Sequence, residues 1–310
     1  MTAPAISVEG LRFAYGDHMV LDRIDLQVDP GEILGIAGAD GAGKSTLLRI
    51  LIGQLPGAGG RIRVLGMEAG DAALREQIAY MPQSFGQYAD LSVQENLQFF
   101  AALHGLSGEQ ARSLIADLVA RAGLRGFEDR RAGQLSGGMM QKLALACALV
   151  SRPRAMFLDE PTTGVDPLSR RAFWQLLEGV RSEGVAIVYA TANMEEAERC
   201  DRVASLQDGR LVRQGRPQDL VAAVDAGLCI VTGSQARKSV AILLRQPEVD
   251  MAFPVGQRVK LWLKPGAAQA ALQAGLAREA PGLQAVSATP GLHDIALREL
   301  ALAQRTARHA

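Results

Sequence analysis

The chain has 310 residues, 48% of them hydrophobic, which is enough to fill the core of one large or two ordinary domains. Its 33 basic and 33 acidic residues balance, so no net charge draws the whole protein toward nucleic acid or an anionic membrane. Its three cysteines form no C-x-x-C pair, which argues against a disulfide framework and against a cysteine metal site.

The N-terminal part of the sequence predicts strands and no targeting signal. Residues 1–10 lack the basic and apolar regions of a signal peptide, and no stretch of the chain approaches the roughly 18 apolar residues of a membrane span. A role at a membrane would therefore need another subunit. Apolar and polar residues alternate over 6–13 and 24–28, with a turn at 15–17, which predicts an antiparallel β layer.

A phosphate-binding loop follows, between a strand and a helix. The continuous apolar run over 33–37 predicts a buried parallel strand, and residues 44–53 predict a helix. The loop between them fits the pattern G-x-x-x-x-G-K-[ST]. We expect these loop residues to bind nucleotide: Gly38, Ala39, Asp40, Gly41, Ala42, Gly43, Lys44, Ser45 and Thr46. A glycine-rich turn with a chance lysine is the alternative, and the flanking strand and helix argue against it.

The residue types in this loop suit polyphosphate chemistry. Its glycines let backbone N–H groups approach the phosphates, which the helix N-terminus attracts with its dipole. Lys44 supplies a positive charge to the β and γ phosphates, and we assign it a catalytic role. The hydroxyl of Ser45 is placed to ligate Mg²⁺, with Thr46 beside it. ATP and Mg²⁺ are therefore the expected ligands.

A mostly helical insert is predicted over about 84–150. Within it, Ser107 and Gln110 predict a capping box for one helix. Near its end lies an LSGG tetrad, formed by Leu135, Ser136, Gly137 and Gly138. Small residues at a helix N-terminus offer N–H groups and a hydroxyl to an anion, so we predict that this tetrad contacts nucleotide. An ordinary N-cap is the alternative for Ser136.

An acidic pair ends the next predicted strand. The apolar run over 155–158 places Asp159 and Glu160 at the carboxyl end of a buried strand. There Asp159 can hold Mg²⁺ through water, and Glu160 can act as general base toward a hydrolytic water. A strand-terminal acidic pair by itself more often caps the next helix, but the phosphate loop upstream favours the catalytic interpretation.

The remaining elements predict an α/β fold followed by a second domain. A strand over 185–190 follows a helix, and Asp208-Gly209 predicts a hairpin turn. Beyond residue 226 a small α+β domain is expected over 227–310, because the pattern there changes to short strands and helices. The strands are predicted at 229–231, 259–263 and 283–286, and the helices at 236–244 and 267–278. A ferredoxin-like topology and a regulatory role are our hypotheses for this domain.

Together, the phosphate loop, the LSGG tetrad and the acidic pair give a resemblance to a known family. Residues from about Ile6 to Ala223 resemble the nucleotide-binding subunit of an ABC transporter, in the branch that exports drugs, lipids or polysaccharides. The resemblance implies a P-loop NTPase fold of the ABC ATPase type, with a parallel core sheet, an antiparallel β layer and a helical insert, in a domain over 6–226. It implies ATPase activity coupled to transport through a separate membrane subunit.

The resemblance also implies roles for particular residues and partners. Tyr15 would stack on adenine, although a strand-end core residue is the alternative, and Gln83 would contact Mg²⁺ and the attacking water in a catalytic role. The LSGG tetrad would close over ATP bound to a second cassette, identical or different, and Asp166 would contact that interface. Aromatic residues after Gln83, including Phe85 and Tyr88, lie where the family receives its integral membrane permease. The expected location is the cytoplasmic face of the membrane, with no nucleic acid partner.

Two positions depart from the family pattern. Met139 follows the tetrad where glutamine is usual, and its side chain cannot hydrogen-bond a ribose or phosphate. Ala192 occupies the position of the histidine that contacts the γ phosphate, so we predict slow hydrolysis at this chain's own phosphate loop.

Two alternative functions stay open. One is a soluble ABC-type ATPase that acts on ribosomes or DNA, and the other is a catalytically weak regulatory cassette. The first lacks a basic tract, and the segment from Thr46 to Leu135 is too short for a long coiled-coil arm. The departures at Met139 and Ala192 favour the second, while Lys44, Asp159 and Glu160 argue against full inactivity.

Overall fold

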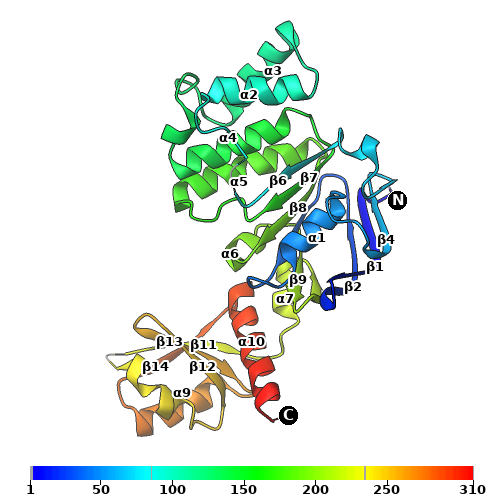
Figure 1. Ribbon diagram of the computed structural model, residues 1–310. Coiled ribbons are helices and arrows are strands. Elements are labelled where there is room, and N and C mark those ends of the chain that lie inside the picture. Colours follow the sequence, from blue (N-terminus) through cyan, green and yellow to red (C-terminus); the bar gives the residue numbers. More distant parts are fainter. Residues whose placement is uncertain (1–2, 85, 234, 310) are drawn as a thin grey trace. The chain divides into compact units, whose positions relative to one another are not determined.

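The computed structural model describes residues 3–84, 86–233 and 235–309, which form two compact units, 1–216 and 217–310 (Figure 1). The predicted boundary lay at residue 226. The structure divides the chain after Arg216, because helix α7 (Pro217–Ala222) packs on helix α10 (Leu292–His309) of the second unit. None of the helices in the described ranges combines the length and the apolar composition needed to cross a membrane.

A six-stranded sheet forms the centre of the first unit, in the order β10-β9-β3-β8-β7-β6. Its strands are β3 (Ile33–Ala37), β6 (Ile78–Met81), β7 (Ala155–Asp159), β8 (Ala186–Thr191), β9 (Arg202–Gln207) and β10 (Arg210–Gly215). All are parallel except β10, which pairs antiparallel with β9 across the predicted two-residue turn at Asp208 and Gly209. Every residue of β3, β7 and β8 is buried, which explains their continuous apolar sequences.

The second layer of this unit is an antiparallel sheet in the order β2-β1-β4-β5. Its strands are β1 (Ile6–Tyr15), β2 (His18–Val28), β4 (Gly59–Val64) and β5 (Met67–Glu68). The sequence predicted β1 and β2, but not β4 and β5. Helix α1 (Lys44–Leu51) shares one hydrophobic core with this layer and with one face of the six-stranded sheet. On the other face, Trp174 of α5 (Pro167–Ser182) contacts the ring of Tyr189.

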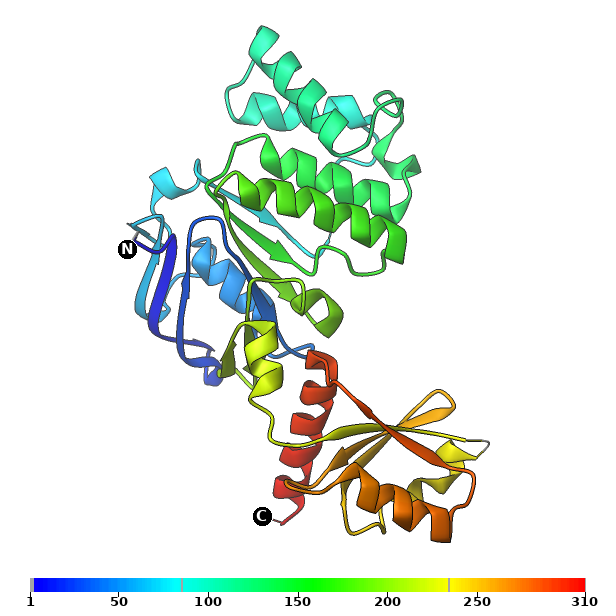
Figure 2. The same ribbon diagram turned by 180° about the vertical axis from the view of Figure 1, so that it is seen from behind.

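The helical insert contains α2 (Val93–Leu103), α3 (Gly108–Arg121) and α4 (Gly137–Leu149), which have a hydrophobic core of their own. Helices α4 and α5 lie side by side in both views (Figure 1, Figure 2). The predicted capping box at Ser107 is wrong. Gly108 enters α3 with φ of +60°, and the Ser107 side chain makes no capping hydrogen bond. The box lies instead on α2, where Ser92 and Glu95 bond reciprocally.

The second unit contains a four-stranded antiparallel sheet in the order β12-β13-β11-β14. Its strands are β11 (Leu228–Thr232), β12 (Val249–Val255), β13 (Arg258–Leu263) and β14 (Gln284–Ala288). Helix α8 (Val240–Leu243) connects β11 to β12, and α9 (Gln269–Glu279) connects β13 to β14. This βαββαβ order is that of a ferredoxin-like sheet.

Two elements of this unit were missing from the sequence prediction. Strand β12 does not alternate apolar and polar residues, because Asp250 is its only polar residue, and Pro254 near its end further obscures the strand pattern. Helix α10 covers the sheet face opposite the buried core of α8 and α9. The guanidinium of Arg298 lies 5.2 Å from the ring centroid of Trp262, and Lys260 forms a 2.6 Å ion pair with Asp294. The amphipathic spacing of α10 becomes informative only once this face is known.

Candidate active site

The loop between β3 and α1 has a backbone path that needs glycine at two positions. Gly43 has φ of +106°, and a Cβ there would lie 2.8 Å from Leu21 Cδ2. A Cβ on Gly38 would lie 2.4 Å from the carbonyl oxygen of Leu206. The loop therefore lies so close to neighbouring strands that a side chain at either position would clash with them.

The side chain of Lys44 lies at the centre of this loop. The residue is only 5% exposed, and its Nζ donates to the carbonyls of Gly38 at 2.9 Å and Ala39 at 3.0 Å. The same Nζ forms a 3.0 Å ion pair with Glu160 Oε1. A nearly buried ammonium in this position is a point charge for an entering phosphate, and the carboxylate of Glu160 neutralises it in this structure.

Ser45 and Asp159 form the part of the site suited to a metal ion. Ser45 Oγ donates to Asp159 Oδ1 at 3.0 Å, and the Tyr80 hydroxyl donates to Oδ2 at 3.4 Å. Burial raises the pKa of Asp159, while these two hydrogen bonds act in the opposite direction. A buried carboxylate beside a hydroxyl fits Mg²⁺, which prefers oxygen ligands. In the described part of the chain no group of three or more His, Cys, Asp or Glu could hold a metal ion, so oxygens of water, phosphate or the Gln83 amide would complete the ligand set begun by Ser45 and Asp159.

Glu160 is held in a backbone conformation that residues other than glycine seldom adopt. Its φ is +49°, and its N–H donates to the carbonyl of Ala190 at 2.9 Å. Oε2 of its carboxylate accepts hydrogen bonds from Gln83 Nε2 at 3.3 Å and Thr163 Oγ1 at 3.2 Å. Such local strain is frequent at functional positions because it fixes the direction of a side chain. Here it directs Glu160 toward Lys44 and Gln83.

Lys44, Ser45, Gln83 and Glu160 line one open cavity of about 250 Å³. Its lining residues are Val20, Asp40, Gly41, Gly43, Lys44, Ser45, Thr46, Gln83 and Glu160. All of them except Val20 were expected from the sequence. Tyr80, which bonds Asp159, was not expected to take part, although it lies three residues before Gln83 in the same segment.

Tyr15 and the LSGG tetrad do not line this cavity. Tyr15 ends β1, is 48% exposed and contacts Phe13 edge to face at 4.9 Å. Ser136 is the N-cap of α4, and its Oγ accepts the N–H of Met139 at 3.3 Å, so the N-cap alternative is confirmed. A Cβ on Gly138 would lie 2.2 Å from the side chain of Ser169, which explains that glycine by the packing of α4 on α5.

Asp166 is also a helix cap within this chain. It is the N-cap of α5, and its Oδ1 accepts the N–H groups of Leu168 and Ser169, each at 3.0 Å. Hydrogen bonds from Ser169 lower the pKa of Asp166, and the one from Leu168 adds to them. The carboxylate is therefore ionised and oriented, but it does not reach the cavity.

A buried carboxylate network beside the site was missed by sequence reasoning. Glu196 is 4% exposed and accepts hydrogen bonds from Tyr189 at 3.0 Å, Thr191 at 2.9 Å and Thr162. Its Oε1 also lies 3.2 Å from Arg170 Nε. The network joins the segments that follow β7 and β8 to α5. The only signal in the sequence was an acidic residue on the apolar side of a short helix.

The hydroxyl of Ser45 gives a direct test of the metal assignment. We expect Ser45→Ala to weaken Mg²⁺-dependent ATP binding by about tenfold or more, because one oxygen ligand is lost. ATP titrations with Mg²⁺ and with EDTA would measure the difference. Ser45→Thr keeps a hydroxyl and is the matched control. An unchanged Mg²⁺ dependence in Ser45→Ala would remove this residue from the metal site.

Comparisons with known proteins show which family this chain resembles. The model of the ABC transporter family matches residues 21–163. The chain is 39% identical over 270 residues to the "Probable multidrug ABC transporter ATP-binding protein YbhF" of Escherichia coli (strain K12), a match that covers 85% of this chain and 47% of that protein. It is 38% identical over 224 residues to the Nod factor export ATP-binding protein I of Rhizobium sp. (strain N33), covering 71% and 74%. The chain thus spans about half the length of the first of these relatives.

Solved structures show the same similarity. The structure of cbiO1 from Clostridium perfringens, part of the ABC transporter complex cbiONQ, has a TM-score of 0.67 and 28% identity, over 79% of this chain and 97% of that one. The dimeric structure of a post-hydrolysis state of the ATP-binding cassette MJ0796, bound to ADP and Pi, has a TM-score of 0.61 and 26% identity, over 68% and 98%.

Proposed function

Because the chain belongs to the family of ABC transporter ATP-binding subunits, we propose that it hydrolyses ATP to drive export through a separate membrane subunit. The observation that carries this proposal is the convergence of Lys44, Ser45, Gln83 and Glu160 at one cavity. Asp159 lies beside this cavity and accepts a hydrogen bond from Ser45. These groups supply the parts that phosphoryl transfer to water requires.

The ion pair between Lys44 and Glu160 suggests how substrate prepares the site. A γ phosphate that enters the loop competes for the Lys44 ammonium, which releases the Glu160 carboxylate. Once released, Glu160 can accept a proton from water, and Gln83, already within 3.3 Å of it, can orient that water. Bound Mg²⁺ supplies counter-charge to the β and γ phosphates, and Ser45, Asp159 and Gln83 are the residues that would hold it.

A second cassette is part of the proposal. Gly137 of the tetrad is exposed, and a Cβ there would meet nothing within 4 Å, so packing within this chain does not require glycine at that position. A close approach from another molecule does explain it. The N-terminus of α4 would then bind ATP held by the partner, and the dimeric relative supports this arrangement. Adenine stacking by Tyr15, which is 48% exposed, belongs to the same proposal.

We propose that the partner cassette is not a second copy of this cassette but a different chain or a different segment of a longer chain. Ala192 is exposed and has no hydrogen-bonding side chain to contact a γ phosphate. The match to the multidrug relative covers only 47% of that protein, which leaves room in it for a second cassette of similar size. The assembly would then have one weak and one efficient site of ATP hydrolysis. A catalytically weak regulatory cassette is accordingly the second candidate function of this chain.

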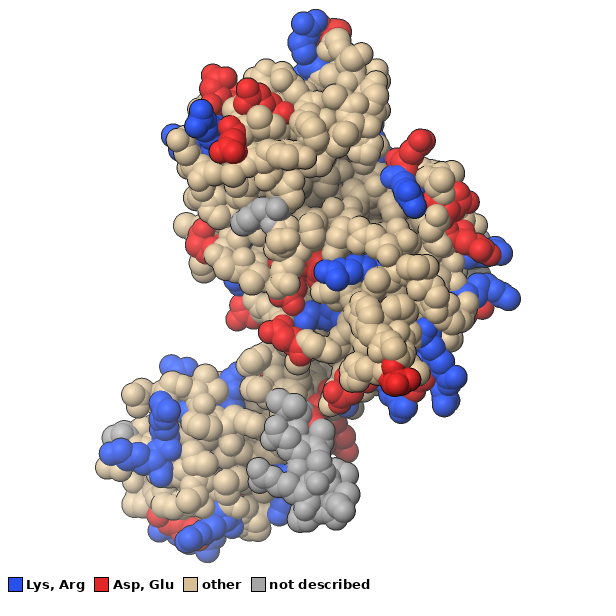
Figure 3. Space-filling view, viewed as in Figure 1, with Lys and Arg blue, Asp and Glu red and all other residues tan. Residues whose placement is uncertain are grey.

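A membrane subunit completes the proposed assembly. Tyr88 is 50% exposed and contacts Phe99 with ring centroids 4.8 Å apart, while Phe85 lies outside the described residues. We propose that this region of the insert meets the permease at the cytoplasmic face of the membrane. On the face of the first unit shown in Figure 3, basic and acidic side chains are interspersed. This face therefore lacks the continuous basic surface that nucleic acid binding needs. The C-terminal unit is proposed to regulate the cassette.

Purification from membranes tests this function. We expect the protein, extracted in detergent, to co-purify with a polytopic membrane subunit and with MgATP-dependent hydrolysis. Recovery of ribosomes or DNA in its place would contradict the proposal and support the soluble alternative.

Restoring the histidine tests the weak-site hypothesis. We expect Ala192→His to raise the maximal rate of ATP hydrolysis by about tenfold or more, because it adds a hydrogen-bond donor for the γ phosphate. Turnover at saturating MgATP is the measurement. Ala192→Phe adds a ring without a donor and is the control. Equal rates in Ala192→His and the original protein would show that this position does not limit hydrolysis.

A further inference from the structure

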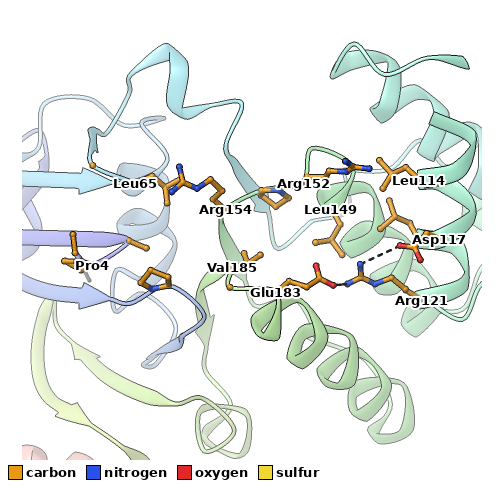
Figure 4. A pocket seen from close by; sticks show the side chains of 17 residues that line it. Pro4, Leu65, Leu114, Asp117, Arg121, Leu149, Arg152, Arg154, Glu183 and Val185 are labelled. Atoms are coloured by element: carbon orange, nitrogen blue, oxygen red, sulfur yellow. Dashed lines mark ion pairs between the residues drawn. The ribbon is translucent and has the colours of Figure 1, made fainter. Parts of the chain in front are cut away.

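A cavity of about 730 Å³ lies in the first unit, between the helical insert and the core (Figure 4). Arg121 in its wall forms ion pairs with Glu183 at 2.7 Å and Asp117 at 3.7 Å, so these three charges satisfy one another. The exposed side chains of Arg152 and Arg154 point away from each other. These arginines therefore do not converge on one ligand, and the cavity is not built as an anion site.

The four-stranded sheet of the second unit has two outer strands, β12 and β14. The free edge of an outer strand carries unpaired N–H and C=O groups, which can pair with a strand of another chain. Three features of β12 oppose such pairing. Its register with β13 shifts between Val249 and Met251, and Pro254 lies near its end. In addition, Arg305 of α10 donates to the carbonyl of Asp250 at 2.8 Å.

Strand β14 has no such protection within its own sequence. Its residues, Gln284–Ala288, include no proline and no charged side chain, and its register with β11 runs without a shift. The central residue, Val286, is apolar and 57% exposed. Alternate residues of an outer antiparallel strand direct their backbone groups away from the neighbouring strand. Without further cover, β14 would therefore be open to pairing with another strand.

Two glutamine side chains of α9 cover this edge. Gln273 Oε1 accepts the N–H of Ala285 at 2.8 Å, and its Nε2 donates to the carbonyl of Leu283 at 3.3 Å. Gln269 Nε2 donates to the carbonyl of Ala285 at 2.7 Å, and its Oε1 accepts the hydroxyl of Ser287 at 2.8 Å. Both backbone groups of Ala285 are therefore satisfied by side chains, as a neighbouring strand would satisfy them.

The position of the two glutamines on α9 suits this task. Residues four apart lie on the same face of a helix, so both amides reach β14 from one side. Each amide carries a donor and an acceptor, which matches the N–H and C=O groups of a strand edge. Leu272 and Leu276 of the same helix are buried in the core of the second unit and hold α9 against the sheet.

We propose that Gln269 and Gln273 form a cap that keeps β14 from pairing with β14 of a second copy of this chain. The edge is self-complementary. With a two-fold axis at Ala285, Leu283 of one copy would lie opposite Ser287 of the other, and their backbone groups would pair in an antiparallel ladder. Such a cap suppresses self-pairing and leaves the chain available for a different partner. The inference goes beyond the proposed ATPase function and does not depend on it.

Hydrogen exchange tests whether the cap protects the edge. In the nucleotide-free full chain at low concentration, Gln273→Ala is expected to speed exchange of the Ala285 amide by about tenfold or more, because the acceptor is lost. Gln273→Glu keeps an acceptor oxygen and is the matched control, in which protection should persist. The amides of β11 should stay protected in both variants, because the fold of the second unit is kept. An unchanged exchange rate of Ala285 in Gln273→Ala would overturn the cap.

Sedimentation over a range of protein concentrations tests what the cap prevents. Without nucleotide, the double variant Gln269→Ala and Gln273→Ala is expected to self-associate at least about tenfold more strongly than the original chain, because the freed backbone groups pair between copies. Arg278→Ala changes an exposed residue of α9 that bonds the carbonyl of Ala274 within its own helix. It is the control and should leave association unchanged. A double variant that associates no more than the original chain would contradict the proposal.

A proline locates the new contact on β14. Ser287→Pro in the double variant removes a backbone donor from the free edge, and we expect it to return association to the level of the original chain. Association that persists with Ser287→Pro would rule out pairing through β14. ATP binding is expected to be unchanged in all of these variants, because the phosphate loop lies in the first unit. The outcome is therefore independent of the proposed ATPase function.

Discussion

Glu160→Gln is expected to lower the rate of ATP hydrolysis by about 100-fold or more while ATP still binds. Glu160 is the carboxylate that faces both Lys44 and Gln83, and an amide in its place cannot accept a proton from water. Binding should persist, because the phosphate loop is unchanged. It should even strengthen slightly, because the amide no longer neutralises the Lys44 ammonium with which an incoming phosphate must pair.

Two measurements separate these effects. Turnover at saturating MgATP reports the chemical step, and equilibrium ATP titration reports binding. Glu76→Gln changes an exposed carboxylate of the same unit and is the control. If Glu160→Gln kept wild-type turnover, Glu160 would not be the general base. If Glu160→Gln lost ATP binding, the ion pair between Glu160 and Lys44 would have a structural role and would not compete with the incoming phosphate.

Glu196→Ala is expected to destabilise the first unit by about 3–5 kcal/mol, the range found when one partner of a buried ion pair is removed. Its carboxylate is 4% exposed and is the shared acceptor for Tyr189, Thr191 and Thr162, with Arg170 beside it. Removal leaves several buried polar groups without a partner. Glu196→Gln keeps an acceptor oxygen but loses the charge opposite Arg170, and we expect an intermediate loss.

The two tryptophans of the chain allow the loss of stability in Glu196→Ala to be measured in the first unit. Trp174 contacts Tyr189 with ring centroids 4.8 Å apart, so its fluorescence reports on the network, while Trp262 lies in the second unit. Urea unfolding in a Trp262→Phe background therefore follows the first unit alone. Glu195→Ala, at an exposed neighbouring position, is the control. A loss in Glu196→Ala no larger than in Glu195→Ala would contradict a stabilising network.

The sequence was most informative where function depends on a short segment. The phosphate loop could be predicted because glycine positions, the lysine and the flanking strand and helix all lie within about twenty residues. Local signals were weaker elsewhere. The capping box was placed at Ser107 when it lies at Ser92, because Gly108 changes the path into α3. Strand β12 was missed because Pro254 obscures its pattern, and helix α10 was missed because its apolar face matches a sheet face that the local sequence does not reveal.

The sequence by itself determined the residue types of the site and the family to which the chain belongs. Only the tertiary structure decided which side chains meet. Ser45 bonds Asp159 across 114 residues, and Gln83 bonds Glu160 across 77, because the carboxyl ends of parallel strands reach the same edge of the sheet. The same structure buried Glu196 within hydrogen-bond distance of Tyr189 and Thr191. Such environments arise from packing between distant segments, and no local pattern encodes them.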